Sequence, residues 1–575
     1  MPTLGQLRNI KLLVVVGRKA NMNEKRGTCW VGYQQIGMKE KNGKMVPNCV
    51  KEVVEIYWEN QNESCGYTFE FEKQPMQEAE YQGRKVKLNK IMQNRSVVIG
   101  VSAIKQKGNF ENLDEALILM DKAVKNAIKD SGNVSIKDHI DEIRVPKGFW
   151  RYRDPGKWIA KNNNFKKIPT TYVTKIGVLQ QNLINESCLK IEKGEINASI
   201  ILGGEARYKQ LRSIIEERKF SEIELNENPD FYIKAKEDLY TEEELKNLGS
   251  MAVGYYASIE TAIRKNDQEG IEEHKEKIAS MYEEFSKIAA ANDDGWINKP
   301  FSKEDILNSS QKNKMLAFPY NKLHCTSWNV NQSAALIICS EELADKLGID
   351  MDKRVYPISS VENNHMIAIQ QRPKLYESLG MNYAAQHIKA EIKRQGIKID
   401  AYDLYSCFPA AVKMFSKSLG LDENENKSIT GSMAYAGGPL NSFVLHSTVR
   451  MIQKIRSLEV NYGLVTGVSG MMTKQSFCIW GKKNKDSFVH KDVTDKAKIK
   501  EIPIKLSNID EGEGEIVGYT VFKNDKDTSI AILYVEDQAK HRKILSSNQN
   551  NFLKMLQKEE WVGRKVRFKN SKVIH

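Results

Sequence analysis

The chain repeats one order of helices and strands, and this repeat limits its possible folds more than any other feature. In the first run, an amphipathic helix over 178–193 leads into the glycine-containing strand Asn197–Ala206. In the second run, a helix over 442–456 leads into the strand Asn461–Gly470. Because helix and strand follow each other in the same way twice, we interpret the two runs as copies of one α/β unit.

A second matched pair of elements lies upstream in each run. A helix around 120–130 precedes the strand Ile140–Val145, and a helix over 381–394 precedes a strand over Ile399–Ser406. The first copy opens with Ser96–Ser102, a continuous apolar strand of the kind that is buried in parallel sheets. The repeat therefore predicts a duplicated α/β domain whose two copies pack as one.

The chain of 575 residues is too long for one ordinary core. Between the copies, helical spacing over Met251–Lys265 and Ile271–Ala291 predicts a polar helical insertion, and Asp114 is placed to cap an early helix. Short strands and one helix near the C-terminus indicate a small OB-like barrel. The predicted regions are a basic extension (1–95), a first half (96–330) with its insertion (about 207–318), a second half (331–485) and the barrel (486–575).

Composition narrows the class of protein. Hydrophobic residues make up 41% and charged residues 28%, and no apolar run approaches the ~18 residues that a membrane span requires. The net charge of +13 comes from lysines spread along the chain without a recognised nucleic-acid motif, which argues against a nucleic-acid partner. Eight cysteines show neither C-x-x-C nor zinc spacing, so we expect no metal site, reduced buried thiols and a cytoplasmic location.

The first 95 residues differ from the rest. They hold sixteen Lys and Arg against ten Glu, and their short strands lack the alternation of helix and strand. Two short parts of it resemble motifs of phage proteins: Gly27–Tyr33 with Gly37–Cys49, and Ala79–Asn89. We interpret this part as a basic appendage without a catalytic role.

Residues 96 to about 575 resemble the thiolase superfamily, and most closely thiolase-like protein type 1, an acetyl-CoA acetyltransferase-like or lipid-transfer-type thiolase. The segments that carry the resemblance occur in the family's order. They are Arg153–Trp158, Ile201–Ala206, Asn329–Glu342, Asp403–Pro409, Ala434–Asn441 and Glu559–Arg564. The resemblance implies a duplicated, five-layered αβαβα thiolase fold with a fused C-terminal barrel. It also implies an acyltransferase ancestry and a coenzyme A thioester as ligand or substrate.

The family's reaction needs a cysteine nucleophile at a helix N-terminus, a histidine, a second cysteine and an Asn or His that helps to bind an oxyanion. The resemblance assigns the first three positions to Gly177, Gly438 and Gly467, and the fourth to Tyr405. Because glycine cannot hold an acyl group, the resemblance implies that covalent acyl transfer by the family's route is lost.

Other candidate residues remain near these positions. Tyr405 carries a phenol that could donate a hydrogen bond to an oxyanion or move a proton, and Ser406 and Cys407 beside it are weaker catalytic candidates. The candidates for ligand binding offer backbone N–H groups at helix starts or an amide; they are Gly177, Gly437, Gly438 and Asn441. The candidates by residue type alone are His324 and His446, and Cys188 is interpreted as a buried core residue.

Three functions stay open. In the leading hypothesis, the chain binds an acyl-CoA or a similar thioester and has lost or altered acyl transfer. The first alternative is a cysteine-independent retro-aldol lyase that acts on a β-hydroxyacyl-CoA, a sterol side chain among the options, with Tyr405 helped by Ser406 or water. The second is a non-catalytic assembly scaffold. The resemblance also leaves a homodimer open, because many thiolases pair through core strands.

Overall fold

The computed structural model describes residues 95–484, 486–523 and 528–574, together with six short strands nearer the N-terminus. The chain divides into two compact units, residues 1–91 and 92–575. In the first unit the strands form three antiparallel pairs. The pairs are β1 (Leu12–Val16) with β4 (Val54–Trp58), β2 (Tyr33–Lys41) with β3 (Lys44–Lys51), and β5 (Glu78–Tyr81) with β6 (Arg84–Lys87).

The second unit contains two large sheets. The first has the order β11-β9-β8-β10-β14-β7 and the second the order β16-β17-β18-β15-β19. The strands of the first sheet are β7 (Ser96–Lys105), β8 (Glu142–Pro146), β9 (Thr170–Thr174), β10 (Ala198–Ala206), β11 (Phe231–Ile233) and β14 (Asn331–Ser340). Those of the second are β15 (Tyr356–Asn363), β16 (Ala401–Asp403), β17 (Tyr462–Ser469), β18 (Lys474–Gly481) and β19 (Val489–Asp492).

Four strands of one sheet correspond to four of the other. The run β8-β10-β14-β7 matches β16-β17-β18-β15, and in both runs the first pair is parallel and the next two pairs are antiparallel. This shared topology confirms the duplication that the sequence predicts.

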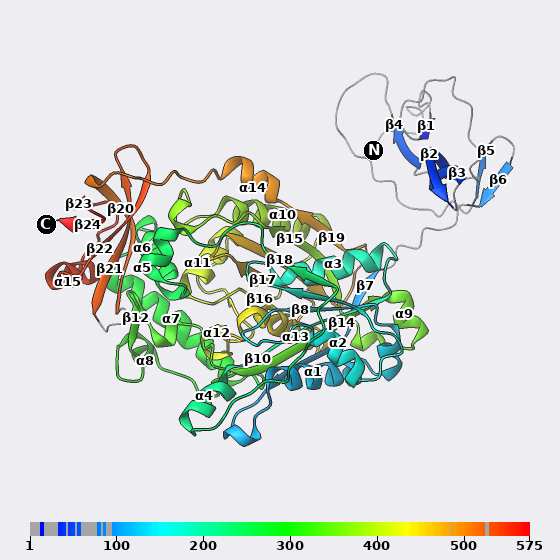
Figure 1. The fold of residues 1–575 in the computed structure, drawn as a ribbon, viewed down its shortest axis with the longest axis horizontal. Coiled ribbons are helices and arrows are strands. Elements are labelled where there is room, and N and C mark those ends of the chain that lie inside the picture. The colour runs from blue at the N-terminus through cyan, green and yellow to red at the C-terminus, as the bar shows by residue number, and fades with distance from the viewer. Residues whose placement is uncertain are drawn as a thin grey trace. The chain divides into compact units, whose positions relative to one another are not determined.

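Helices complete five layers (Figure 1). Helix α1 (Ala116–Asp130) packs on the first sheet and α10 (Leu379–Gln395) on the second, while α3 (Gln180–Glu192) and α13 (Phe443–Arg456) contact strands of both sheets. Helix α13 is buried along ten of its fourteen residues, as expected for a helix enclosed between two sheets. The predicted five-layered αβαβα fold is therefore confirmed.

The segment between β10 and β14 forms the predicted helical insertion, and it also adds strands to two sheets. Strand β11 extends the first sheet beyond β9, and β12 and β13 join the C-terminal sheet through β20. The elements of this segment, besides β11, are α4 (Arg207–Ile215), α5 (Glu242–Leu248), α6 (Ala252–Asn266), α7 (Ile271–Ala290), α8 (Lys303–Leu307), β12 (Met315–Ala317) and β13 (Tyr320–Asn321).

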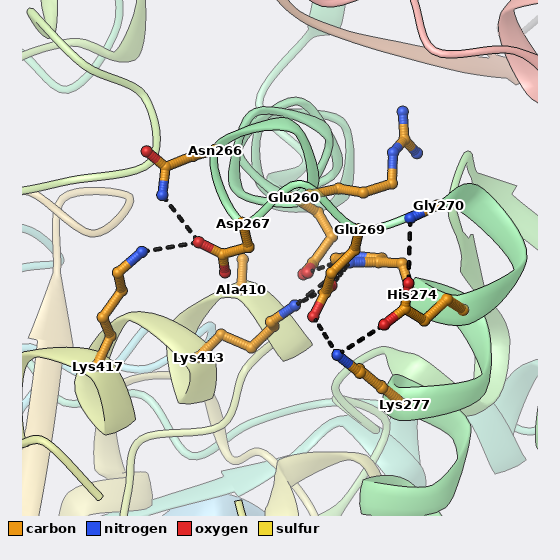
Figure 2. A network of polar contacts seen from close by, with 12 residues as sticks. Glu260, Asn266, Asp267, Glu269, Gly270, His274, Lys277, Ala410, Lys413 and Lys417 are labelled. Carbon is orange, nitrogen blue, oxygen red and sulfur yellow. Dashed lines mark hydrogen bonds and ion pairs between the residues drawn. The ribbon is translucent and has the colours of Figure 1, made fainter.

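A buried polar network fastens the insertion to the second half (Figure 2). His274 of α7 lies between two carboxylates, with Nε2 2.9 Å from Glu260 Oε1 and Nδ1 2.5 Å from Glu269 Oε2. Lys413 of α11 (Pro409–Leu419) pairs with Glu269 at 3.1 Å, and the Tyr320 hydroxyl donates to Glu260 at 2.5 Å. Burial opposes ionisation of Glu260, but its polar neighbours, His274 first, hold the pKa of this carboxyl below its usual value.

The C-terminal strands close into a barrel, as the sequence predicts. The ring runs β20-β21-β22-β24-β23 and returns to β20. Its elements are β20 (Glu511–Lys523), β21 (Ser529–Asp537), β22 (Arg542–Ser547), β23 (Lys565–Lys569), β24 (Lys572–Ile574) and the helix α15 (Asn550–Lys558). The remaining helices are α2 (Pro155–Asn162), α9 (Glu341–Lys346), α12 (Ser432–Tyr435) and α14 (Thr494–Lys500). None of the helices in the described part of the chain has the length and apolar character of a membrane span.

Candidate functional site

The predicted site residues gather at the carboxyl ends of the parallel strands, where open α/β sheets bind ligands. Gly177 follows β9, Tyr405 follows β16, and Gly467 lies near the end of β17. Helices α3 and α13 also begin here, and the Val444 N–H of α13 donates to the Gln180 side-chain oxygen of α3 at 2.8 Å. The two central helices therefore meet at their N-termini, and one of the first N–H groups of α13 is already occupied.

The three glycines that the resemblance assigns to catalytic positions share one property: a side chain at any of them would collide with a packed neighbour. A Cβ atom would lie 2.8 Å from Ala235 at Gly177, 2.1 Å from Thr326 at Gly438 and 2.6 Å from Ser476 at Gly467. Gly177 also has a φ of +100°, which L side chains rarely adopt. The space that a cysteine or histidine would need is filled at all three positions.

The buried side chain of Tyr405 packs against Phe443, the first residue of α13. Its backbone N–H donates to Thr466 Oγ1 at 2.7 Å, and its ring meets the ring of Phe443 edge-on at 6.1 Å. Burial raises the pKa of the Tyr405 phenol well above its usual value. The phenol therefore stays protonated at neutral pH, which suits it to donate a hydrogen bond rather than to accept a proton as a base.

Ser406 and Cys407 have structural partners. The Ser406 hydroxyl accepts a hydrogen bond from the Met433 N–H at 3.1 Å, which fixes the start of α12. Burial raises the pKa of the Cys407 thiol to about 12, so the nucleophilic thiolate is scarce at neutral pH. The Cys407 carbonyl accepts from the Thr326 hydroxyl at 2.8 Å, and this threonine is the residue that fills the space beside Gly438.

Asn441 is the ligand-binding candidate with a group left unsatisfied. It lies in a 3₁₀ turn, Leu440–Ser442, directly before α13, and its side chain is 8% exposed. Among the described residues, no acceptor lies within hydrogen-bond reach of its Nδ2. A buried donor without a partner costs about 1–3 kcal/mol, so this amide is suited to an acceptor brought by a ligand.

The candidates by residue type are core residues. Burial lowers the pKa of His446 in α13 and of His324 to about 4, so both imidazoles are neutral at neutral pH. His324 Nδ1 accepts a hydrogen bond from the Asn321 N–H at 3.1 Å. Cys188 lies inside α3, where burial raises its thiol pKa.

Sequence reasoning missed Glu205, the penultimate residue of β10. Its side chain is 2% exposed, and Oε1 accepts a hydrogen bond from the Phe149 N–H at 2.9 Å. Burial raises the pKa of the Glu205 carboxyl to about 8, close to the value that acid–base catalysis uses. Its cross-strand neighbour Gln332 lies against Gly437, which places Glu205 beside the predicted site. The sequence signal that could have identified Glu205 as a candidate was a carboxylate near the end of a fully buried strand.

The site residues do not line a groove of 1470 Å³ elsewhere in the second unit. This groove lies along α7, α11 and residues 421–427. Its charged side chains are paired with one another, for example Lys417 with Asp267 and Lys277 with Glu273. Within the described residues, no group of three or more His, Cys, Asp or Glu side chains is placed to hold a metal ion.

Neither a protein-family model nor a curated protein matches the sequence. Solved structures do match the structure of this chain. A monomeric SCP2-thiolase-like protein type 1 from Mycobacterium smegmatis is 21% identical, with a TM-score of 0.70 over 84% of this chain and 98% of that one. An Ltp2–ChsH2(DUF35) aldolase is 15% identical over 68% of this chain and 98% of that one, with a TM-score of 0.49. Human mitochondrial 3-ketoacyl-CoA thiolase in complex with CoA has the same identity, coverages and TM-score. On the first of these similarities, the chain has the fold of an SCP2-thiolase-like protein.

Proposed function

We propose that the chain binds an acyl-CoA or a related thioester in the layer between its two sheets. The observation that carries this proposal is the buried Asn441 amide, whose Nδ2 has no acceptor among the described residues. A thioester carbonyl oxygen is an acceptor that would satisfy this donor, and its negative charge in a reaction would strengthen the bond.

Binding in this proposal does not lead to an acyl-cysteine. The three glycines have no room for a side chain, and the Cys407 thiol is held protonated. Tyr405 has a protonated phenol at the start of α13 and is our candidate for a second donor to the thioester oxygen. The site is thus suited to polarising a carbonyl rather than attacking it.

Glu205 favours a second candidate, retro-aldol cleavage of a β-hydroxyacyl-CoA. The carboxylate of Glu205 would take the β-hydroxyl proton, and the Cα–Cβ bond would break to release an aldehyde or ketone. Tyr405 and Asn441 would stabilise the enolate of the thioester until Cα takes up a proton. Because burial keeps the Tyr405 phenol protonated, this scheme assigns the base to Glu205 instead of Tyr405.

The β9 edge of the first sheet bears on the homodimer hypothesis. Strand β11 of the insertion pairs with β9 along that edge, so a second copy cannot add a strand there. We therefore propose a monomer, which sedimentation of the purified chain would test.

The test is thermal melting with CoA, acetyl-CoA, a long-chain acyl-CoA and a steroid acyl-CoA, with product analysis of the same samples. We expect stabilisation by at least one thioester, because a ligand of the native state raises the melting temperature. Asn441→Ala should melt normally without ligand and lose the shift, while the exposed Asn551→Ala should keep it. No shift with any thioester would sink the proposal and leave the assembly scaffold as the surviving hypothesis.

A further inference from the structure

Strand β18 begins with a buried lysine, at the edge of the second sheet where the predicted site residues gather. Lys474 pairs with Ser469, the last residue of β17, and Ser476 pairs with Gly467. Because successive side chains of a strand point to opposite faces of the sheet, the side chains of Lys474 and Ser476 share one face. Only 6% of the Lys474 side chain is exposed. The lysine is therefore a buried group on the face that also includes Gly467.

Glu362 of β15 belongs to the same face, because it lies opposite Ser476. Relative to Lys474 it is the diagonal neighbour across two antiparallel strands, and such residues are about 7–8 Å apart. The Glu362 carboxylate accepts hydrogen bonds from Asn185 and Asn182 of α3, at 2.7 Å and 3.2 Å. This face of the second sheet is therefore turned toward the layer of central helices.

The ammonium group of Lys474 has little compensation for its burial. Among the described residues, the one carboxylate within 4 Å of its Nζ is Glu237 of the insertion, at 3.9 Å, which is beyond hydrogen-bond reach. Glu237 also pairs with Lys498 Nζ at 3.6 Å, and the Lys498 side chain is 47% exposed. The carboxylate is thus shared between a buried amine and a surface amine, and it marks the side from which a small molecule would approach Lys474.

Two polar atoms beside Lys474 and Glu362 are also buried without partners. In the described part of the chain, no group lies within hydrogen-bond reach of Ser476 Oγ or of Asn182 Oδ1. Buried polar atoms are almost always satisfied by the protein, by ordered water or by a ligand. This part of the central layer is therefore suited to a small polar molecule.

The surroundings favour the neutral amine of Lys474. Burial lowers the pKa of this ammonium and the neighbouring cation Lys498 lowers it further, while Glu237 and Glu362 oppose both effects. Burial also raises the pKa of the Glu362 carboxyl to about 7. A desolvated lysine beside a second cation is an arrangement in which lysine acts as a nucleophile toward carbonyl compounds. A free amine and a protonated carboxyl are the two forms that imine formation uses.

We propose that Lys474 forms an imine with a small ketone or aldehyde, and that Glu362 moves the protons. The lone pair of Nζ adds to the carbonyl carbon, and the carbonyl oxygen takes the proton of Glu362. The nitrogen then returns a proton to the Glu362 carboxylate. The hydroxyl group leaves with that proton as water, and a protonated C=N bond remains. This activity needs neither Asn441 nor a thioester, so it goes beyond the proposed function and does not rest on it.

The experiment traps the imine in the full chain. The purified protein is incubated with acetone near neutral pH and reduced with borohydride, which converts the imine into a stable isopropyl-lysine. Peptide mass spectrometry then locates the modified residue. We expect the adduct at Lys474 at a level at least about tenfold above that at any exposed lysine, because a lowered ammonium pKa leaves more free amine. Omission of acetone or of borohydride should leave Lys474 unmodified.

Variants separate the reaction from a structural role of Lys474. Lys474→Arg keeps a cation beside Glu237 but has no amine that forms an imine, so it should melt like the wild type and lose the adduct. Lys498→Arg changes the exposed partner of the same carboxylate, and this matched control should keep the adduct at Lys474. Glu362→Gln should slow adduct formation at least about tenfold, because the proton donor is gone.

Each outcome decides. An adduct spread over exposed lysines, or none at Lys474, would overturn the proposal, and mapping of the wild type gives this answer even where a variant does not fold. Modification of Lys474 by acetyl-CoA without borohydride, and not by acetone, would make the lysine an acyl acceptor and overturn the imine. An unchanged rate in Glu362→Gln would overturn the role of Glu362. An adduct at Lys474 without a melting shift by any thioester would support the imine and sink only the proposed function.

Discussion

The two central helices, α3 and α13, occupy corresponding places in the two halves, but the segments that precede their N-termini differ. The loop before α3 is closed by the insertion, because Ala235 lies where a side chain on Gly177 would point. The turn before α13 ends in Asn441, whose amide has no partner among the described residues. Gln180 at the start of α3 supplies its side chain to α13. The duplication thus provides two equivalent helix starts, and the second carries a buried side-chain donor without a partner among the described residues.

The largest expected effect concerns the insertion, which only the first half carries. His274→Ala removes the imidazole between two carboxylates and leaves the buried Glu260 without its main polar partner. Removing the partner of a buried ionisable group typically costs about 3–5 kcal/mol. Lys277→Ala, at the half-exposed rim of the same network, should cost no more than about 1 kcal/mol. Equal effects in urea unfolding would show that the buried network does not hold the insertion.

The first half should lose stability as the pH rises. The pKa of Glu205 is about 8 in the folded chain and about 4.5 in the unfolded chain, so the folded state holds the proton more tightly. Stability is complete below about pH 4.5 and falls until pH 8, by roughly 3–5 kcal/mol. Glu205→Gln should remove most of this loss when unfolding is measured at pH 5 and at pH 8. An unchanged pH dependence would mean that Glu205 is ionised in the native protein.

The second half should lose stability in the opposite direction. Burial lowers the pKa of His446 from 6.5 to about 4, so the unfolded chain binds the proton first. Stability is complete above about pH 6.5 and falls as the pH drops to 4, by about 3 kcal/mol for this histidine. His446→Gln should flatten the acid side of the stability curve and leave the alkaline side unchanged. If the variant denatures in acid just as the wild type does, other groups control the acid limit.

The smallest effect comes from adding a side chain at Gly438, where the resemblance implies a histidine. Gly438→His places a Cβ 2.1 Å from Thr326, and overpacking of this kind costs about 1–3 kcal/mol. Gly270→Ala, where nothing lies within 4 Å of the new Cβ, is the control and should be close to neutral. Urea unfolding compares the two variants. A Gly438→His chain as stable as the wild type would show that the site has room for an imidazole.

Local sequence patterns predicted the positions of most helices and strands well. They failed where contacts between residues distant in the sequence determine where an element begins or ends. The helix expected over 271–291 is observed at Ile271–Ala290, because apolar spacing and turn residues are local signals. Asp114 was wrongly predicted to cap α1: Glu115 is the N-cap, and Asp114 accepts from Gln106 and Lys122 instead. The strand expected over Ile399–Ser406 ends at Asp403.

The strand stops at Asp403 for a reason that no local pattern contains. The Asp403 carboxylate accepts hydrogen bonds from the N–H groups of Ile429 and Thr430. The Tyr405 N–H turns to the Thr466 hydroxyl and leaves the ladder. Both partners come from segments more than twenty residues away, so the position of the Tyr405 side chain was settled by tertiary contacts.

The amino-acid sequence was enough to predict the duplicated order of elements, the layers that this order implies, the barrel and the absence of side chains at Gly177, Gly438 and Gly467. These features depend on residue identity and on spacing within one helix or strand. Tertiary contacts were needed to show that the insertion lends strands to two sheets and that the Asn441 amide has no partner among the described residues. Such features arise where residues distant in the chain meet, and burial of a group or the loss of its partner exists only after that meeting.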